Sequence, residues 1–293
     1  MSKFNLRGAT VIVTGGSRGI GPHIAAALTR EVARVALVAR SAPELEANAR
    51  KLSASGAEVV AFPADVTSAE QRRELIAAVE GRLGPVDVLV NNAGGDLQRE
   101  FHHLTEEEIQ GLLELNLTSA MMLTRLVLPG MLERGRGHVV NVSSMAGRVS
   151  FPYTEAYAAA KDGLIAFTRV LRSDYRAQGV SASTLILGPV GREGVGARTA
   201  EEVGIKLPPV GLVSPEKIGR ITVRAIASDK TELAVLPGPG KLFRALMDRF
   251  PGMGPAMNRA TGTGKTMQTV AEYREGEARL AAAERAAFEG SSR

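Results

Sequence analysis

The sequence predicts an α/β fold in which helices cover both faces of a doubly wound parallel sheet. Short apolar runs alternate with segments of helical composition along residues 1–236. The apolar runs are nearly continuous, as strands are when both faces of a sheet are buried. We therefore expect one domain over 1–236, followed by a C-terminal extension over 237–293 that is expected to be helical.

Each expected strand is a short apolar run that ends in turn-forming or polar residues. The first is a β-branched run that leads into glycines. In chain order the expected strands are Ala9–Val13, Val35–Ala39, Val59–Pro63, Val86–Val90, His138–Val142, Ser183–Leu187 and Leu233–Leu236.

Helices are expected between these strands. The first begins near Pro22, where a missing N–H group costs little. Another begins after Ser214, which is a favourable N-cap and is followed by proline. The other expected helices lie within 43–54, 68–82, 105–134, 154–178 and, rich in Ala, Glu and Arg, 267–289.

The composition excludes several classes of function. The 293 residues include no cysteine, which excludes disulfides, thiolate metal ligands and a cysteine nucleophile. The four histidines show no metal-ligand spacing, so no metal is expected. The net charge of +5 is scattered and does not indicate nucleic-acid binding. Without a signal-like segment or an apolar stretch of about 20 residues, we expect a cytoplasmic protein with no membrane span.

The stretch TGGSRGIG, residues 14–21, follows the first expected strand and opens the first helix. Glycines at Gly15, Gly19 and Gly21 let a backbone approach a pyrophosphate, and the helix N-terminus supplies N–H groups. A plain strand-to-helix turn could carry the same glycines.

Two arginines bear on the choice of cofactor. No acidic residue ends the second strand, where one would bind the 2′-hydroxyl of NAD. Arg40 stands there instead, and Arg18 lies in the glycine turn. Because guanidinium groups bind phosphate in bidentate fashion, the sequence favours NADP(H) and does not exclude NAD(H). The alternative is that both arginines are solvated.

Polar residues follow the third and fourth strands, at the edge where open α/β sheets bind ligands. Asp65 could accept a hydrogen bond from an adenine amino group. Asn91 and Gly94 could line the cofactor. Each is also typical of an ordinary turn.

Ser144 follows the fifth strand, and Tyr157 and Lys161 follow it one helical turn apart. Residues i and i+4 share a helix face, and an ammonium group lowers a phenol pKa from about 10. A serine hydroxyl could hold a carbonyl oxygen. The three side chains suit general acid–base catalysis on a carbonyl/alcohol pair.

Taken in order, these motifs resemble the short-chain dehydrogenase/reductase family over about residues 5–236. The motifs are Gly-x-x-x-Gly-x-Gly at 15–21, Asp65, Asn-Asn-Ala-Gly at 91–94, Asn116, Ser144 and Tyr157-x-x-x-Lys161. The resemblance implies a Rossmann-type doubly wound parallel sheet and hydride transfer between NAD(P)(H) and a carbonyl or alcohol.

The resemblance also implies residue roles. Tyr157 would be the proton donor or acceptor, Lys161 would lower its pKa and hold the nicotinamide ribose, and Ser144 would orient the substrate oxygen. Asn116 would support a water-linked proton relay. Besides Tyr157 and Lys161, the implied cofactor contacts are Gly15, Ser17, Arg18, Gly19, Ile20, Gly21, Arg40, Asp65, Val66, Asn92, Ala93, Gly94, Gly188 and Val190. A homodimer or homotetramer through 105–134 and 154–178 is implied too.

The chain departs from the family pattern after the sixth strand. Leu187 stands where proline is usual, and Arg192 where threonine would meet the nicotinamide amide. Residues 192–212 would form the substrate lid.

The leading hypothesis is an NADP(H)-dependent oxidoreductase for an apolar ketone or secondary alcohol. One alternative is a 3-oxoacyl-thioester reductase, and another is an inactive NADP-binding regulator or scaffold. The apolar segment 242–250 suggests a packed helix, a wall for a lipid-like substrate, or a helix that binds a membrane surface peripherally.

Overall fold

The computed structural model describes residues 4–191, 193–205, 211–238, 245, 249–250, 252–260 and 262–291. Its sheet has seven strands in the order β3-β2-β1-β4-β5-β6-β7, and every neighbouring pair is parallel. The predicted fold class is confirmed. The strands are β1 (Thr10–Thr14), β2 (Arg34–Ala39), β3 (Val59–Pro63), β4 (Val86–Asn91), β5 (Gly137–Ser144), β6 (Val180–Leu187) and β7 (Glu232–Val235).

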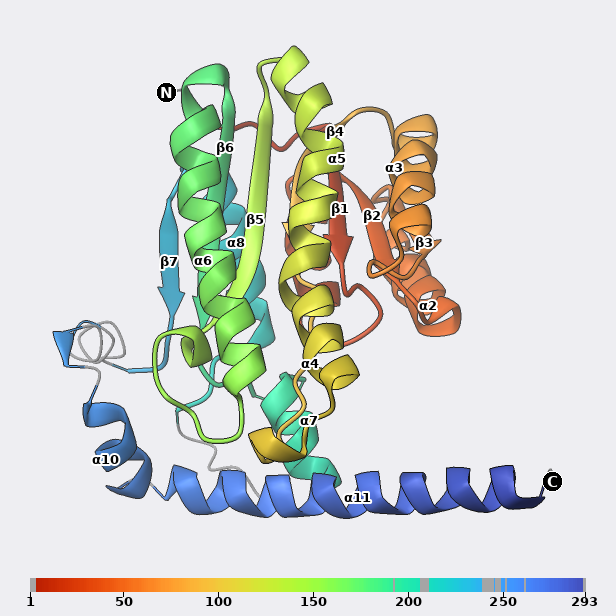
Figure 1. Ribbon diagram of the computed structural model, residues 1–293. Coiled ribbons are helices and arrows are strands. Elements are labelled where there is room, and N and C mark those ends of the chain that lie inside the picture. The colour runs from red at the N-terminus through yellow and green to blue at the C-terminus, as the bar shows by residue number, and fades with distance from the viewer. Residues whose placement is uncertain are drawn as a thin grey trace.

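The helices lie between the strands and after the last one (Figure 1). Ser214 caps α8 as expected, accepting the Lys217 N–H at 3.3 Å. Helix α7 was not among the expected elements, whereas α10 lies within the extension that was expected to be helical. The helices are α1 (Gly21–Thr29), α2 (Ala42–Ser53), α3 (Ala69–Leu83), α4 (Glu106–Leu113), α5 (Ser119–Glu133), α6 (Glu155–Tyr175), α7 (Val195–Glu202), α8 (Pro215–Ala227), α10 (Met253–Ala260) and α11 (Thr263–Ser291).

The core lies in two layers, one on each face of the sheet. Successive strand side chains point to opposite faces. Val11 and Val13 therefore pack with α1, α2 and α8, whereas Ile12 between them packs with α3, α5 and α6. Because both faces must be covered, a continuous apolar strand requires helices on both sides, which is why the sheet is doubly wound.

The strand order reverses beside β1. The chain builds β1, β2 and β3 outward in one direction, then returns to place β4 on the other side of β1. The loops at the carboxyl ends of β1 and β4 meet beside this reversal, and in open α/β folds the crevice at such a point binds ligands. The glycine turn and residues 92–94 both lie at this point.

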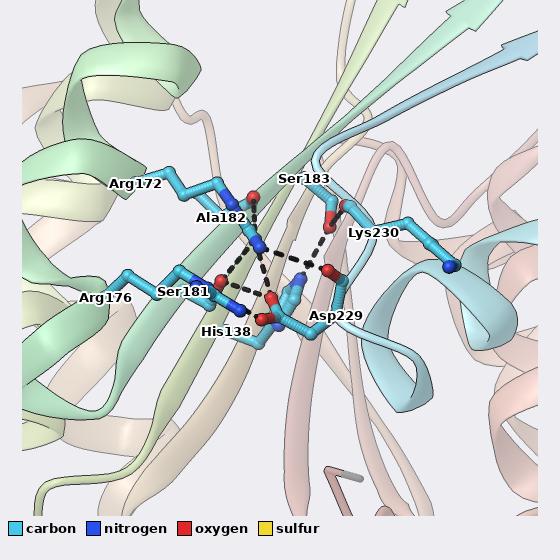
Figure 2. Close-up of polar contacts among 8 residues, drawn as sticks. All are labelled: His138, Arg172, Arg176, Ser181, Ala182, Ser183, Asp229 and Lys230. Carbon is cyan, nitrogen blue, oxygen red and sulfur yellow. Dashed lines mark hydrogen bonds and ion pairs between the residues drawn. The ribbon is translucent and has the colours of Figure 1, made fainter. Parts of the chain in front are cut away.

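The opposite end of the sheet is held by a buried polar cluster (Figure 2). Asp229, in the turn between α8 and β7, accepts hydrogen bonds from Arg172 at 2.6 Å, Arg176 at 2.9 Å and Ser181 at 2.5 Å. Three opposing donors hold the pKa of Asp229 well below its usual range, although burial alone would raise it. The cluster ties α6 and β6 to the last strand.

The C-terminal helices lie across the end of the sheet at which the strands finish. Figure 1 shows α11 running beneath α6, α7 and α4, with α10 beside it. Asn258 of α10 donates to the Ser150 carbonyl at 2.5 Å. Most of the apolar segment 242–250 lies outside the described residues. The packed helix, the substrate wall and the membrane-binding helix proposed for it therefore stay predictions.

One helical segment of the described chain, Glu106–Glu133, is long and apolar enough to cross a membrane by length and composition. It joins α4, a π-helical turn at Glu114–Thr118 and α5. Our expectation that no such stretch exists was therefore too strict. Leu123, Val127 and Met131 of this segment are buried against the sheet, as in a core helix.

Candidate active site

The glycine turn packs directly on the loop after β4. Gly15 and Gly19 have positive φ values of 69° and 68°, which side-chain-bearing residues rarely adopt. A Cβ at Gly15 would lie 2.8 Å from Nδ2 of Asn92, and one at Gly21 would lie 2.1 Å from the Gly15 carbonyl oxygen. Close approach therefore requires glycine at positions 15 and 21, and a positive φ favours it at positions 15 and 19.

Asn92 joins β1 to β4 beside that turn. Its Nδ2 donates to the Thr14 carbonyl at 2.9 Å, and its backbone N–H donates to Thr14 Oγ1 at 2.9 Å. Its Oδ1 is buried and finds no hydrogen-bond partner among the described residues. An acceptor left open at this place suits a ligand donor such as a ribose hydroxyl.

Asn91 does not line the crevice, contrary to expectation. It is buried, and its Nδ2 donates to Asn141 Oδ1 at 2.8 Å. Asn141 in turn donates to Thr168 Oγ1 at 2.8 Å. Asn91 is the last residue of β4, and strand alternation turns its side chain toward α5 and α6.

Asp65 stands at the end of β3 with its carboxylate held in place. Its Oδ1 accepts the Thr67 N–H at 2.9 Å and the Thr67 hydroxyl at 2.7 Å. Burial alone would raise the pKa of Asp65, but these bonds, Arg40 and Arg72 together lower it. Arg40 therefore faces the acid that we expected near the adenine, and Val66 beside it is buried.

The start of the predicted lid is seated over the glycine turn. Glu193 lies 2.8 Å from His23 of α1, and Arg198 of α7 donates to the Glu193 carbonyl at 2.8 Å. A Cβ at Gly19 would lie 3.0 Å from the Arg198 guanidinium. Burial and the neighbouring Arg18 lower the pKa of Arg198. Two arginines thus converge where a pyrophosphate would lie, and Arg198 was not predicted.

The base of the lid is an extension of the sheet. Gly188 N–H donates to the Val235 carbonyl at 3.0 Å, and Val190 forms a parallel bridge with Val213. Leu187 is the buried last residue of β6 and pairs with Ser144 and Val235. It therefore continues the strand where proline would end it. Arg192 lies outside the described residues.

Asn116 sits in the π-helical turn between α4 and α5. It is 1% exposed, and its Nδ2 donates to the carbonyls of Gly95 at 2.8 Å and Leu112 at 2.9 Å. Its Oδ1 accepts the Gly95 N–H at 3.2 Å. Single π turns inside α-helices often mark functional sites. Here the turn aims Asn116 at the loop after β4.

Ser144, Tyr157 and Lys161 meet at the carboxyl end of β5. Ser144 hydrogen-bonds Tyr157 and also accepts the Ala146 N–H at 3.1 Å. Lys161 is 5% exposed, and its ammonium donates to the Val142 carbonyl at 3.1 Å and lies 5.6 Å from the centre of the Tyr157 ring. Ser143 holds the same helix by donating to the Lys161 carbonyl at 2.7 Å.

The pKa of Tyr157 shifts in the direction opposite to our expectation. Burial and the nearby Asp96 raise it, and the hydrogen bond with Ser144 opposes them only in part. Burial lowers the pKa of Lys161 to about 8, with Asp96 opposing that shift. Loss of hydration and the charge of Asp96 therefore outweigh the hydrogen bond with Ser144, and the phenol holds its proton.

Asp96 is the residue of this centre that the sequence analysis missed. Burial raises its pKa to about 7, against hydrogen bonds from Leu97 and Gln98 and the charge of Lys161. The signal was a carboxylate directly after Asn-Asn-Ala-Gly-Gly, at the carboxyl edge of the sheet. The predicted cofactor contacts in that stretch ended at Gly94.

A sequence model described as short chain dehydrogenase matches residues 9–202. The chain belongs to the short-chain dehydrogenase/reductase family. It is therefore an oxidoreductase of the class that acts on a CH–OH group or a carbonyl, as predicted.

Curated relatives of this short-chain dehydrogenase/reductase include the ketoacyl reductase HetN of Nostoc sp. It is 37% identical over 235 residues, which are 80% of each chain. The acetoacetyl-CoA reductase of Shinella zoogloeoides is 37% identical over 223 residues, covering 75% of this chain and 90% of that protein.

Solved structures agree on the fold. The alcohol dehydrogenase of Thermococcus sibiricus, complexed with 5-hydroxy-NADP, has a TM-score of 0.69 at 29% identity and covers 78% of this chain and 96% of its own. A metagenomic short-chain oxidoreductase in complex with NADP has a TM-score of 0.67 at 30% identity. The match covers 80% of this chain and 99% of that protein. Each of the two alignments thus leaves about a fifth of this short-chain dehydrogenase/reductase uncovered.

Proposed function

We propose that this protein reduces a carbonyl compound at the expense of NADPH, with Tyr157 as the proton donor. The observation that carries the proposal is the meeting of Ser144, Tyr157 and Lys161 at one end of β5, beside the strand-order reversal. Open α/β sheets bind ligands at that end. The raised pKa of Tyr157 keeps the phenol protonated, which suits proton donation.

Ser144, Tyr157 and Lys161 have separate roles in the proposed reaction. Ser144 and Tyr157 both present hydroxyl groups to one point, where a carbonyl oxygen would accept two hydrogen bonds. NADPH, when bound, supplies the hydride that reduces the carbonyl carbon. Tyr157 transfers its phenolic proton to the oxygen as negative charge develops there, and the product is an alcohol. The phenolate that is left is stabilised by the buried Lys161 ammonium.

Residues around the strand-order reversal fit a dinucleotide. The glycines at the turn, the open Oδ1 of Asn92 and the Arg198 guanidinium beside Gly19 would hold its ribose and pyrophosphate. Ser17, Ile20, Ala93 and Val190 complete the cofactor contacts that we propose.

NADP(H) is the form that we propose over NAD(H). Arg18 and Arg40 are both exposed at the ends of β1 and β2, and the two similar structures were solved with NADP or 5-hydroxy-NADP. Arg40→Asp should weaken NADPH binding at least tenfold and NADH binding much less, measured by cofactor fluorescence. Arg50→Asp, on the exposed face of α2, is the control. Equal losses for both cofactors would contradict the phosphate role of Arg40.

The proposed substrate is an apolar ketone. A 3-oxoacyl thioester is the second candidate, because the names of the Nostoc and Shinella relatives specify ketoacyl and acetoacetyl-CoA substrates. NADPH oxidation should be followed with acetoacetyl-CoA, a free 3-oxo ester and cyclic apolar ketones. A preference for the CoA thioester over the matching ester of at least tenfold would support the second candidate.

The enzymatic role has a direct test. Tyr157→Phe should lose nearly all reductase activity while binding NADPH as tightly as the wild type. Tyr175→Phe, at the far end of the same helix, is the matched control and should stay active. Tight NADPH binding with no turnover of any ketone, and no difference between wild type and Tyr157→Phe, would favour the regulator or scaffold instead.

A homodimer or homotetramer is part of the proposal. Val170 on α6 is 60% exposed, which suits burial in a helix-to-helix contact. Size-exclusion chromatography with light scattering should give a mass at least twice that of the chain. Val170→Glu should lower that mass. A wild-type mass equal to that of one chain would contradict the proposed homo-oligomer.

A further inference from the structure

Asp96 lies in a loop that is held at both of its ends. At one end Gly95 exchanges two hydrogen bonds with Asn116. At the other end Arg99, 6% exposed, donates to Glu108 of α4 at 2.7 Å and to Glu275 of α11 at 2.9 Å. The position of Asp96 is therefore determined by α4, α11 and the π-helical turn together.

This loop passes directly over the catalytic lysine. A Cβ at Gly94 would lie 3.2 Å from the Lys161 ammonium and 2.7 Å from Asn116 Oδ1. Two residues later, Oδ1 of Asp96 is sealed from solvent and makes no hydrogen bond within the described chain. A buried carboxylate oxygen without a donor is costly, and proteins rarely keep one without a role.

Among the described residues, the charged and titratable groups that interact with Asp96 come from α6. They are Lys161, which attracts its negative charge, and Glu155 and Tyr157, whose negative forms it repels. The neighbouring π-helical turn presents the neutral Asn116. Every acid–base group of the proposed mechanism is therefore within the electrostatic reach of this carboxylate.

We propose that Asp96 is a positioning residue of the catalytic centre, whose ionised carboxylate holds the proton on the Tyr157–Lys161 pair and so favours reduction over oxidation. This inference rests on the proposed function. Reduction requires the protonated phenol, whereas oxidation of an alcohol requires a base. A negative charge nearby makes proton loss harder, whichever of the two groups would lose it.

The first test is the pH dependence of kcat for reduction of a ketone that the wild type accepts. Asp96→Asn should move the alkaline limb of the profile down by about one pH unit, which changes the fraction of protonated pair about tenfold. At a fixed pH on that limb, the ratio of oxidation rate to reduction rate should rise. Asp162→Asn removes the same charge next to Lys161, but from a side chain that is 53% exposed, and should leave the limb in place.

The second test needs no activity. The chain has no tryptophan and four tyrosines, so tyrosinate absorbance of wild type minus Tyr157→Phe reports the ionisation of Tyr157 alone. In the wild type, the pKa of Tyr157 should lie above the value of about 10 for free tyrosine. In Asp96→Asn, the pKa of Tyr157 should be lower than in the wild type.

The outcomes separate the two proposals. An unmoved alkaline limb in a folded, NADPH-binding Asp96→Asn variant would overturn the role of Asp96 while leaving the reductase proposal intact. If Asp96→Asn does not fold, the wild-type titration decides, because ionisation of Tyr157 at or below about 10 overturns the role by itself. Loss of the reductase proposal would instead appear as full activity in Tyr157→Phe.

Discussion

Asn116 and Gly95 exchange two hydrogen bonds, from the Asn116 amide to the Gly95 carbonyl at 2.8 Å and from the Gly95 N–H to Asn116 Oδ1 at 3.2 Å. The pairing fixes the loop after β4 to the π-helical turn at Glu114–Thr118. Because that loop also covers Lys161 and carries Asp96, its backbone position governs the catalytic centre.

Gly94→Ala should abolish most activity, since its Cβ would lie 2.7 Å from Asn116 Oδ1 and 3.2 Å from the Lys161 ammonium. Either group would have to move. Gly111→Ala is the control, because no described atom lies within 4 Å of its added Cβ. That change should stabilise α4 by about 0.5–1 kcal/mol. Steady-state kinetics and urea unfolding check both, and a fully active Gly94→Ala would contradict the geometry.

Gly19→Ala should weaken NADPH binding more than tenfold. Its φ of 68° is unfavourable for alanine, and its Cβ would lie 3.0 Å from the Arg198 guanidinium. Gly56 is the control, because its φ of 83° gives alanine the same backbone strain while no described atom lies within 4 Å of the added Cβ. Gly56→Ala should cost about 1–2 kcal/mol of stability and leave binding unchanged. The prediction fails if both variants bind NADPH equally well in a fluorescence titration.

Glu275→Ala should loosen α11 from the active-site loop. It leaves buried Arg99 with Glu108 as its one acidic partner among the described contacts, at a cost of about 1–3 kcal/mol. We expect a higher KM for the ketone and faster proteolysis within α11. Glu277→Ala removes the same charge two residues away, where the side chain is 52% exposed, and should have little effect. Similar proteolysis of both variants would argue against the anchor.

His138 should make the protein lose stability in mild acid. Its Nε2 lies 2.8 Å from Ser183 Oγ, and Ser183 donates to the Lys230 carbonyl, so Nε2 must carry the proton (Figure 2). Burial lowers the pKa of His138 to about 4, while an unfolded histidine titrates near about 6.5. Between these values the unfolded chain binds more protons, so stability falls as the pH drops, by about 3 kcal/mol over the window.

Urea unfolding at pH values from 7 to 4 measures how the free energy of unfolding changes with pH, that is, its slope against pH. His138→Gln should flatten it, and His102→Gln, whose side chain is 72% exposed, should not. The low pKa of Asp229 places its own contribution below this window, because that stability is lost only as the pH falls through lower values. An unchanged slope in a folded His138→Gln variant would contradict the assignment.

Much of the architecture was predictable because it depends on local patterns. Continuous apolar runs at β1, β2, β4 and β5 predicted a parallel sheet buried on both faces, and the structure places strands there within a few residues of the expected ends. Ser214 and Pro215 predicted the start of α8 through the chemistry of a helix N-terminus. Helix α7 was missed because its Gly-rich start resembles a loop, and it is held by contacts with His23 and α11.

By itself, the sequence determined the fold class, the family and most of the side chains gathered at the carboxyl edge of the sheet, because hydrophobic patterning and motif spacing specify these. Only the tertiary structure decided how those side chains behave. Asn91 turned into the core through strand alternation, and Tyr157 holds its proton because burial and Asp96 outweigh its hydrogen bond with Ser144. Asp96 itself acquired its place through Asn116, Glu108 and Glu275, which are distant in the sequence. Burial and long-range electrostatics depend on such contacts, and no local pattern encodes them.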